Sequence, residues 1–157
     1  MGNATAVIDR FEQGATSVEN ALRGLPGDLE TRDPGPGKWS IWKIAAHIAD
    51  AELVTAARLR WIAAEPGSAL KAYDQDLWAE NLAYGRREVK DSLALFLALR
   101  KGTATLLRNL PENAWSRTGV HEERGELSLL DVVIGATEHT EHHAQQINAI
   151  RAGAAAA

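Results

Sequence analysis

The run Glu138-His139-Thr140-Glu141-His142-His143 lies near the centre of residues 128–151, the stretch that decides the predicted fold. As a helix, this stretch places His139 and His143 one turn apart on the same face. Residues at steps of three or four continue that face with the spacing of a buried stripe: Leu129, Val132, Ala136, His139, His143, Gln146 and Ile150. Two imidazoles thus occupy core positions. Burying them side by side favours a ligand that binds both, such as a divalent metal ion.

Three more segments of the chain carry amphipathic helical patterns, and each is followed by Gly or Pro residues that end a helix. They cover about residues 5–22, 40–65 and 87–110. Breaker-rich or polar connections separate them, with one or two helical turns expected within 73–84 and no convincing strand anywhere. The sequence therefore predicts one domain over residues 1–157, an all-α, up-and-down four-helix bundle with long inter-helix loops.

The two halves of the chain share a short and weak sequence similarity. The segments Leu22-Arg23-Gly24-Leu25-Pro26 and Leu107-Arg108-Asn109-Leu110-Pro111 each precede a long loop and a helix that begins after a serine. Two similar halves would place the helices at 40–65 and 128–151 in the same direction through the bundle. A similarity this short is explained as well by chance as by an internal repeat.

The second predicted helix supplies a further histidine to the core. His47 lies seven residues after Ser40, the expected N-cap, or about 10 Å into the helix. His139 lies eleven residues after Ser128, so parallel helices would leave the two imidazoles about one turn apart in height. A metal ion held by His47, His139 and His143 would keep one coordination position open for water or substrate. That open position favours catalysis, or the binding of an outside ligand, over a purely structural site.

Composition excludes several classes of function. The hydrophobic fraction of 45% and the charged fraction of 24% are ordinary for a globular protein with a core. The formal charge of −4 provides no basic field, which argues against nucleic-acid and membrane partners. No apolar run approaches transmembrane length and the N-terminus shows no leader pattern, so we expect a cytoplasmic protein. Because the chain has no cysteine, any metal must be bound by His, Asp or Glu.

Two polar residues outside the three histidines are candidates for proton transfer. Asp50 lies one turn from His47 and could accept its ring N–H or act as a base. An aspartate on the helix surface explains Asp50 nearly as well. His121 precedes the last helix, where it could overhang the metal or be an ordinary loop histidine. We expect an enzyme if one of these groups lies near the metal, and a binding protein if the pocket is apolar.

Other features near the histidines are interpreted as structural. His142 lies outside the buried stripe of the predicted helix and is expected to face solvent. Thr140 stands where the common helical zinc-protease motif requires a glutamate, so no peptidase is indicated. Arg58 lies eleven residues after His47, about 16 Å along the helix, which is too far to reach the metal. We expect Arg58 to pair with Asp74 or Asp76 instead.

Spaced motifs over most of the chain resemble the DinB/YfiT family of bacterial metal-binding four-helix bundles. The motifs are Gly37-Lys38-Trp39-Ser40 before His47-Ile48-Ala49-Asp50, then Arg58, Tyr73-Asp74-Gln75-Asp76-Leu77-Trp78-Ala79-Glu80, His121, and Ser128-Leu129 before His139-x-x-x-His143. The resemblance implies a site that binds Zn or Ni through His47, His139 and His143. It also implies a choice of activities, because some relatives transfer low-molecular-weight thiols (bacillithiol, mycothiol or glutathione) and others are called hydrolases.

We therefore expect a divalent-metal-dependent enzyme that acts on a small molecule. It would either transfer a low-molecular-weight thiol to an electrophilic substrate or hydrolyse its substrate with metal-activated water. Asp50 and His121 are the candidate catalytic residues. The alternative is a metal- or ligand-binding stress protein without turnover. A small-molecule substrate and a thiol are the expected partners, and a homodimer is left open.

Overall fold

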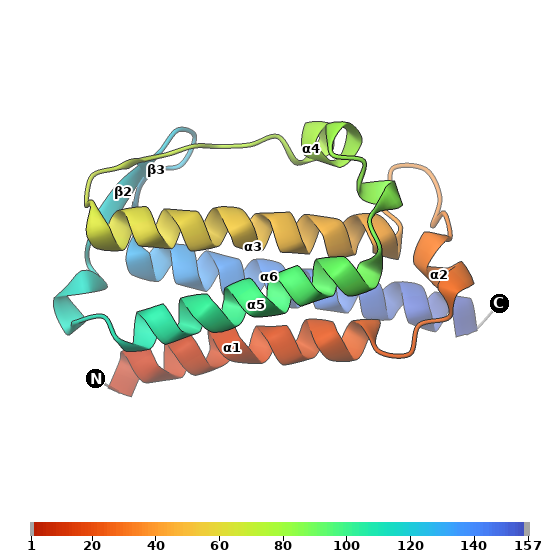
Figure 1. Cartoon of the computed structure of the whole chain (residues 1–157), viewed down its shortest axis with the longest axis horizontal. Coiled ribbons are helices and arrows are strands. Elements are labelled where there is room, and N and C mark those ends of the chain that lie inside the picture. Colours follow the sequence, from red (N-terminus) through yellow and green to blue (C-terminus); the bar gives the residue numbers. More distant parts are fainter. Residues whose placement is uncertain (1, 156–157) are drawn as a thin grey trace.

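Four long helices form the body of the protein in the computed structural model, which describes residues 2–155 (Figure 1). They agree with the predicted segments to within a few residues. The predicted class, an all-α four-helix bundle with long inter-helix loops, is confirmed, whereas successive helices do not all alternate in direction as the predicted up-and-down order requires. The long helices are α1 (Gly2–Leu22), α3 (Ile41–Ala64), α5 (Val89–Arg108) and α6 (Leu129–Ala155).

Short elements occupy the connections. These are α2 (Gly27–Thr31), α4 (Gln75–Asn81), the 3-10 helices η1 (Tyr84–Arg86) and η2 (Glu112–Ala114), and the strands β1 (Ala69–Leu70), β2 (Thr118–His121) and β3 (Gly125–Ser128). The turns expected within 73–84 are therefore present, as α4 and the start of η1. Within residues 2–155, no helix has both the length and the apolar character needed to cross a bilayer.

The two helices that carry the histidines begin at serine caps. Ser40 accepts a hydrogen bond from the Lys43 N–H at 3.4 Å at the start of α3. Ser128 and Asp131 cap α6 reciprocally: the Ser128 N–H donates to the Asp131 carboxylate at 2.9 Å, and the Asp131 N–H donates to the Ser128 hydroxyl oxygen at 3.1 Å. Such caps fix where each helix begins, and so which residues face the core.

The long helices run in the order up, down, down, up. Figure 1 shows α1 and α6 running in one direction and α3 and α5 in the other. Hydrogen bonds agree for the first pair, because Arg10 bonds to Glu141 and Arg151 bonds to the carbonyl oxygen of Ala21 further along both helices. The successive helices α3 and α5 can run in the same direction because the connection between them crosses the length of the bundle before α5 begins.

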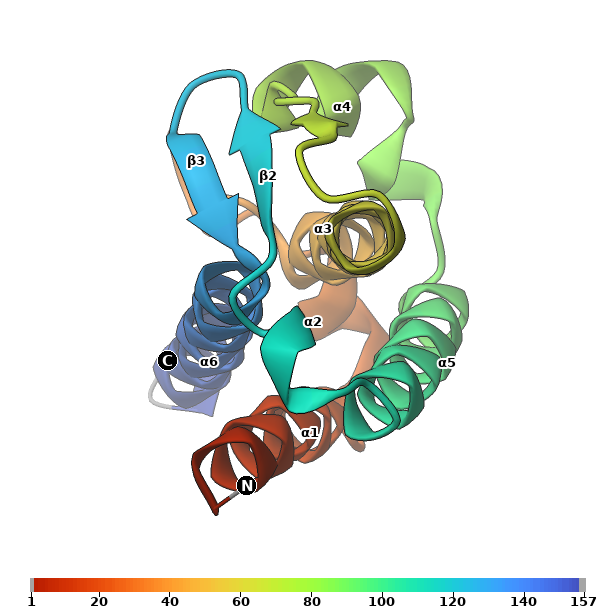
Figure 2. The same cartoon turned by 90° about the vertical axis from the view of Figure 1, so that its left-hand side faces the viewer.

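The expectation that the helices at 40–65 and 128–151 run in the same direction is wrong. The observed helices α3 and α6 pack side by side and are antiparallel (Figures 1 and 2). Antiparallel packing places the first half of α3 beside the middle of α6. His47 therefore lies at the height of His139 and His143, and the mismatch of about one turn calculated for parallel helices does not arise.

A small sheet forms where no strand was expected. Its strand order is β1-β2-β3, with β1 parallel to β2 and β2 antiparallel to β3. The strands have only two to four residues, too few for an alternating pattern to be read from the sequence. Gly119 permits this packing, because a Cβ atom there would lie 2.9 Å from the Leu70 side chain. Figure 2 shows that β3 leads directly into α6.

A buried arginine on α5 bonds to residues of the three other long helices. Arg100 of α5 is 1% exposed and pairs with both carboxylate oxygens of Glu52 of α3, at 2.9 and 2.7 Å. It also donates to the Phe11 carbonyl oxygen of α1 and to the Thr140 hydroxyl of α6, each at 2.7 Å. Because Thr140 directly follows His139, this network holds α6 in register beside the site.

Candidate metal centre

The structure brings His47, His139 and His143 together. The Nε2 atom of His139 lies 2.9 Å from Nε2 of His47 and 3.1 Å from Nε2 of His143. One nitrogen atom from each of the three rings lies within 4.8 Å of the others. His47 comes from α3, whereas His139 and His143 come from successive turns of α6. The i, i+4 spacing and the position of His47 on a buried face are the reasons that these side chains converge.

Imidazole chemistry shows that this arrangement fits a cation. Each ring nitrogen has one position in the ring plane, which holds either a proton or a lone pair. Nε2 of His139 can therefore share a proton with only one of its two neighbours, and the remaining close nitrogen–nitrogen contact is left without a hydrogen bond. Three Nε2 lone pairs directed at one ion remove this conflict. Three imidazole nitrogens are a common donor set for zinc and related divalent ions.

Burial keeps the three imidazoles neutral, as metal ligands must be. His47 is 1% exposed, and burial, followed by the positive charge that His143 can carry, lowers its pKa to about 4. Burial, followed by the charges of His143 and His47, lowers the pKa of His139 to about 3. Burial also lowers the pKa of His143, although the hydrogen bond to Gln146 opposes this effect. The nitrogen lone pairs are thus available at neutral pH.

Two neighbouring side chains orient these rings. Nδ1 of His143 lies 2.8 Å from Oε1 of Gln146. An amide oxygen only accepts, so the proton of His143 lies on Nδ1 and its lone pair lies on Nε2, facing the other histidines. The Trp39 ring packs edge-on against His47 with centroids 5.2 Å apart. The role of Gln146 was not predicted, although a polar residue one turn after His143 in a buried stripe was a usable signal.

The two predicted proton-transfer residues, Asp50 and His121, are each bonded to groups other than the three histidines. Asp50 is 6% exposed, and its carboxylate accepts a hydrogen bond from Arg87 at 2.8 Å. His121 ends β2, and its Nδ1 accepts the backbone N–H groups of Glu123 and Arg124 at 3.2 and 3.3 Å. His121 thereby holds the turn between β2 and β3. Neither residue lines the cavity that reaches His139, and their catalytic role stays a prediction.

His142 and Arg58 were both predicted to have structural roles. His142 is exposed, as expected from its position off the stripe. The expected pairing of Arg58 with Asp74 or Asp76 is wrong, because Arg58 instead donates to the carbonyl oxygen of Lys71. The Asp74 carboxylate is occupied by capping α4, where it accepts the N–H groups of Asp76 and Leu77.

A cavity of about 240 Å³ reaches the metal centre from the N-terminal half of α6. His139 forms part of its wall, together with side chains of α3, of the segment before α4 and of the turn between β2 and β3. Its lining residues are Ala51, Thr55, Arg58, Tyr73, Arg124, Leu127, Val132, Gly135, Ala136 and His139. Tyr73 was noted only as part of a motif shared with the family, and Arg124 was not predicted, because the short connection that carries it has no regular pattern.

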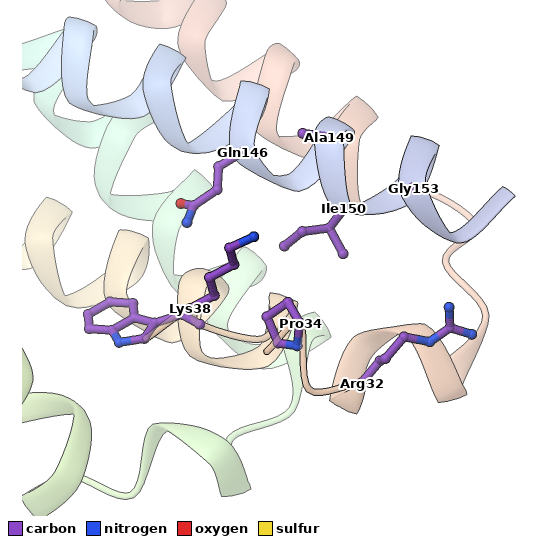
Figure 3. Close-up of a pocket in the computed structure, with 8 residues that line it drawn as sticks. Arg32, Pro34, Lys38, Gln146, Ala149, Ile150 and Gly153 are labelled. Carbon is purple, nitrogen blue, oxygen red and sulfur yellow. The ribbon is translucent and has the colours of Figure 1, made fainter. Parts of the chain in front are cut away.

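A second cavity, of about 530 Å³, lies beyond His143 toward the C-terminal end of α6 (Figure 3). Trp39 and Gln146, which contact His47 and His143, are among its lining residues. Figure 3 shows the Lys38 side chain extending across this cavity toward Gln146 and Ile150. Because one cavity adjoins residues 132–139 of α6 and the other residues 146–153, they flank the three histidines along this helix.

Fold and site together define a helical bundle with a buried three-histidine centre suited to a divalent metal ion. The chain belongs to the DinB superfamily, whose family model matches residues 10–147. A relative from Oceanobacillus iheyensis is 31% identical over 143 residues, which cover 91% of this chain and 83% of the relative. A relative from Geobacillus kaustophilus is 29% identical over 143 residues, covering 83% of this chain and 80% of the relative. Both are provisionally named metal-dependent hydrolases.

Solved structures show the same fold. YfiT from Bacillus subtilis, provisionally described as a metal-dependent hydrolase with an unusual four-helix bundle topology, superposes with a TM-score of 0.88 at 22% identity, covering 96% of this chain and 87% of YfiT. A mycothiol-dependent maleylpyruvate isomerase gives a TM-score of 0.76 at 11% identity, covering 92% of this chain and 60% of the isomerase. At these identities the two structures support the bundle topology, while the family match rests on sequence.

Proposed function

We propose that this protein is a divalent-metal-dependent enzyme that transfers a low-molecular-weight thiol to a small electrophilic substrate. The observation that carries the proposal is the pair of cavities flanking the three histidines. A transfer between two molecules needs room for both beside one centre. The smaller cavity includes His139 in its wall, and the larger one reaches the side chains that orient His47 and His143.

Each residue of the centre has a defined part in this proposal. His47, His139 and His143 hold the ion through their Nε2 atoms, and zinc and nickel are the ions to test first. Gln146 keeps the proton of His143 on Nδ1. When bound, a divalent ion would supply Lewis acidity that lowers the pKa of a thiol at the open coordination position. Trp39 packs edge-on against the ring of His47.

The lining of the smaller cavity suits the attack of a thiolate better than a reaction that needs a protein base. Among the described residues that line it, none has a carboxylate and only His139 has an imidazole. Burial raises the pKa of Tyr73, so its hydroxyl stays protonated at neutral pH. The thiol proton would pass to solvent, the sulfur would form a bond to the electrophilic carbon, and the leaving group would depart with its bonding electrons.

Hydrolysis is the second candidate, because the two relatives reported above are named as hydrolases. It would use the same three histidines, with water in place of the thiol. A metal- or ligand-binding protein without turnover is the third reading. All three share the ion, so metal content alone does not separate them.

The test begins with elemental analysis of the purified protein. Zinc- and nickel-loaded protein is then assayed with glutathione, bacillithiol and mycothiol and an uncharged chromogenic aryl halide, and separately with a chromogenic ester without thiol. We expect metal-dependent transfer from at least one thiol. His47→Ala should abolish this transfer, and His142→Ala should preserve it. Ester cleavage without thiol transfer would support the hydrolase. Absence of both activities from fully loaded protein would support the binding protein and overturn the proposal.

A further inference from the structure

Two arginines line the smaller cavity beside His139. Arg58 comes from α3 and is half-buried, and Arg124 comes from the turn between β2 and β3 and is exposed. No acidic side chain is among the described residues that line this cavity. The described lining therefore carries two positive charges and no negative one, while Glu122 and Glu123 act on Arg58 from outside the lining. Two arginines facing one cavity attract an anion.

Neither guanidinium has a carboxylate partner within residues 2–155. Arg58 donates to the carbonyl oxygen of Lys71, and its Nε–H is buried without a partner. The guanidinium of Arg124 makes no ion pair or hydrogen bond in the described part of the chain. The nearby carboxylate of Glu122 accepts the N–H of Ala72 instead. Several charge-assisted donors at this wall thus have no acceptor from the protein.

The surroundings of these arginines favour an anionic ligand in two further ways. Burial and, to a smaller extent, the positive charge of Arg124 lower the pKa of Arg58. Tyr73, Glu122 and Glu123 oppose this effect without cancelling it, so the charge of Arg58 is incompletely compensated. An anion between the two guanidinium groups would remove that cost. The protonated hydroxyl of Tyr73 is a third donor lining the same cavity.

We propose that this cavity binds an anionic group, carboxylate or phosphate, of the small substrate through Arg58 and Arg124. The planar guanidinium fork matches both groups in two-point contacts. The inference rests on the proposed function in that it places the uncharged, reacting part of the substrate beside His139. His121 acts here as a positioning residue, because its Nδ1 accepts the Arg124 N–H and holds the turn that carries this arginine.

The test uses calorimetric titration of the protein as purified and after zinc loading. The probes are benzoate, phenyl phosphate and benzamide, which share a phenyl ring and differ in charge. We expect benzoate or phenyl phosphate to bind and benzamide to bind at least about tenfold more weakly. The comparison of the two anions identifies which anionic group the cavity prefers.

Variants then assign the binding to the arginines. Arg124→Gln and Arg58→Gln should each weaken anion binding by about tenfold or more. Arg60→Gln is the matched control on the same helix, because Arg60 bonds to the Ala56 carbonyl oxygen and the Thr103 hydroxyl, away from this cavity. It should keep the wild-type affinity. Thermal melts confirm that each variant is folded, and Arg124→Gln, at an exposed turn, is the variant least able to disturb folding.

Equal affinity for benzamide and benzoate would overturn the inference. The inference would also be overturned if anions bound only after zinc loading and if Arg124→Gln and Arg58→Gln left that binding unchanged. In that case the zinc ion alone would bind the anion. The proposed function is judged separately by turnover of an uncharged electrophile in the wild-type protein. Arginine-dependent anion binding without any thiol transfer would support the anion site and contradict only the proposed thiol-transfer function.

Discussion

The hydrogen bond between Gln146 and His143 provides a sharp test of the metal centre. Gln146→Leu keeps a side chain of similar size but removes the acceptor that holds the His143 proton on Nδ1. Loss of such an orienting partner typically weakens metal binding about 10- to 100-fold. That factor corresponds to about 1.4–2.7 kcal/mol of binding free energy. At metal concentrations well above both dissociation constants, the stabilisation supplied by the metal falls by the same amount.

Two measurements check this magnitude. Competition with a chromogenic zinc chelator gives the affinity directly, and thermal melts give the change in stability. For a protein of this size, 1 kcal/mol changes the midpoint by about 2–4 °C. The zinc-loaded variant should therefore melt about 3–10 °C below zinc-loaded wild type. The metal-free proteins should melt at similar temperatures, because Gln146 is partly exposed and its main contact is with His143.

The neighbouring residue supplies a matched control. Gln145 is exposed on the opposite side of α6, so Gln145→Leu makes the same chemical change away from the histidines. We expect its zinc affinity to equal that of wild type. The reasoning fails if Gln146→Leu also binds zinc with wild-type affinity. In that case the orientation of His143 would not depend on this hydrogen bond.

Three further results are expected. His47→Ala, His139→Ala and His143→Ala should each sharply reduce metal content after identical purification, whereas His142→Ala should not; equal content in all four variants would contradict the three-histidine centre. Removal of the metal with a chelator should leave the helical circular dichroism signal and a cooperative melt at a lower midpoint, because apolar burial supplies most of the stability. Thiol transfer should vanish with the metal and return with zinc or nickel, and outright unfolding would indicate a structural ion. Metal-free protein should also lose stability as pH falls from about 6.5 toward 4, since the unfolded state then binds protons that the buried His47, with its pKa lowered to about 4, does not. For His47 the expected loss is about 3 kcal/mol in the free energy of unfolding. Urea titrations at several pH values would measure it, and a free energy of unfolding that stays constant across this range would contradict the prediction.

The long helices and the three histidines could be predicted because their signals are local. Serine caps and helical periodicity determine where α3 and α6 begin and which face is buried. An i, i+4 pair on a buried face must point to one place whatever the rest of the fold does. To predict the third histidine, His47, the sequence also had to show a neighbouring helix with a buried histidine, and α3 was the candidate with that pattern. These inferences did not depend on how the helices are connected.

The directions of the helices and the small sheet could not be predicted for a different physical reason. The connection between α3 and α5 is long enough to turn back or to cross the bundle, and nothing in its sequence chooses between the two. The strands are stabilised by contacts between distant segments, as when Gly119 packs against Leu70. Arg58 illustrates the same limit: its partner is a backbone carbonyl oxygen of Lys71, and side-chain charges gave no indication of that contact.

The candidate metal centre lies on the long helices, whereas several residues that line the smaller cavity lie on the connections. This difference limits what the relatives indicate about the reaction. The three histidines and the Arg100–Glu52 pair lie on the long helices, so a chain that keeps the bundle can keep the metal centre. Several side chains that would meet a substrate lie instead on connections, including Tyr73 before α4 and Arg124 in the β2–β3 turn. At about 30% identity, connections can differ while helices are retained. The lining of the two cavities is therefore better evidence for this protein's substrate than the names of its relatives.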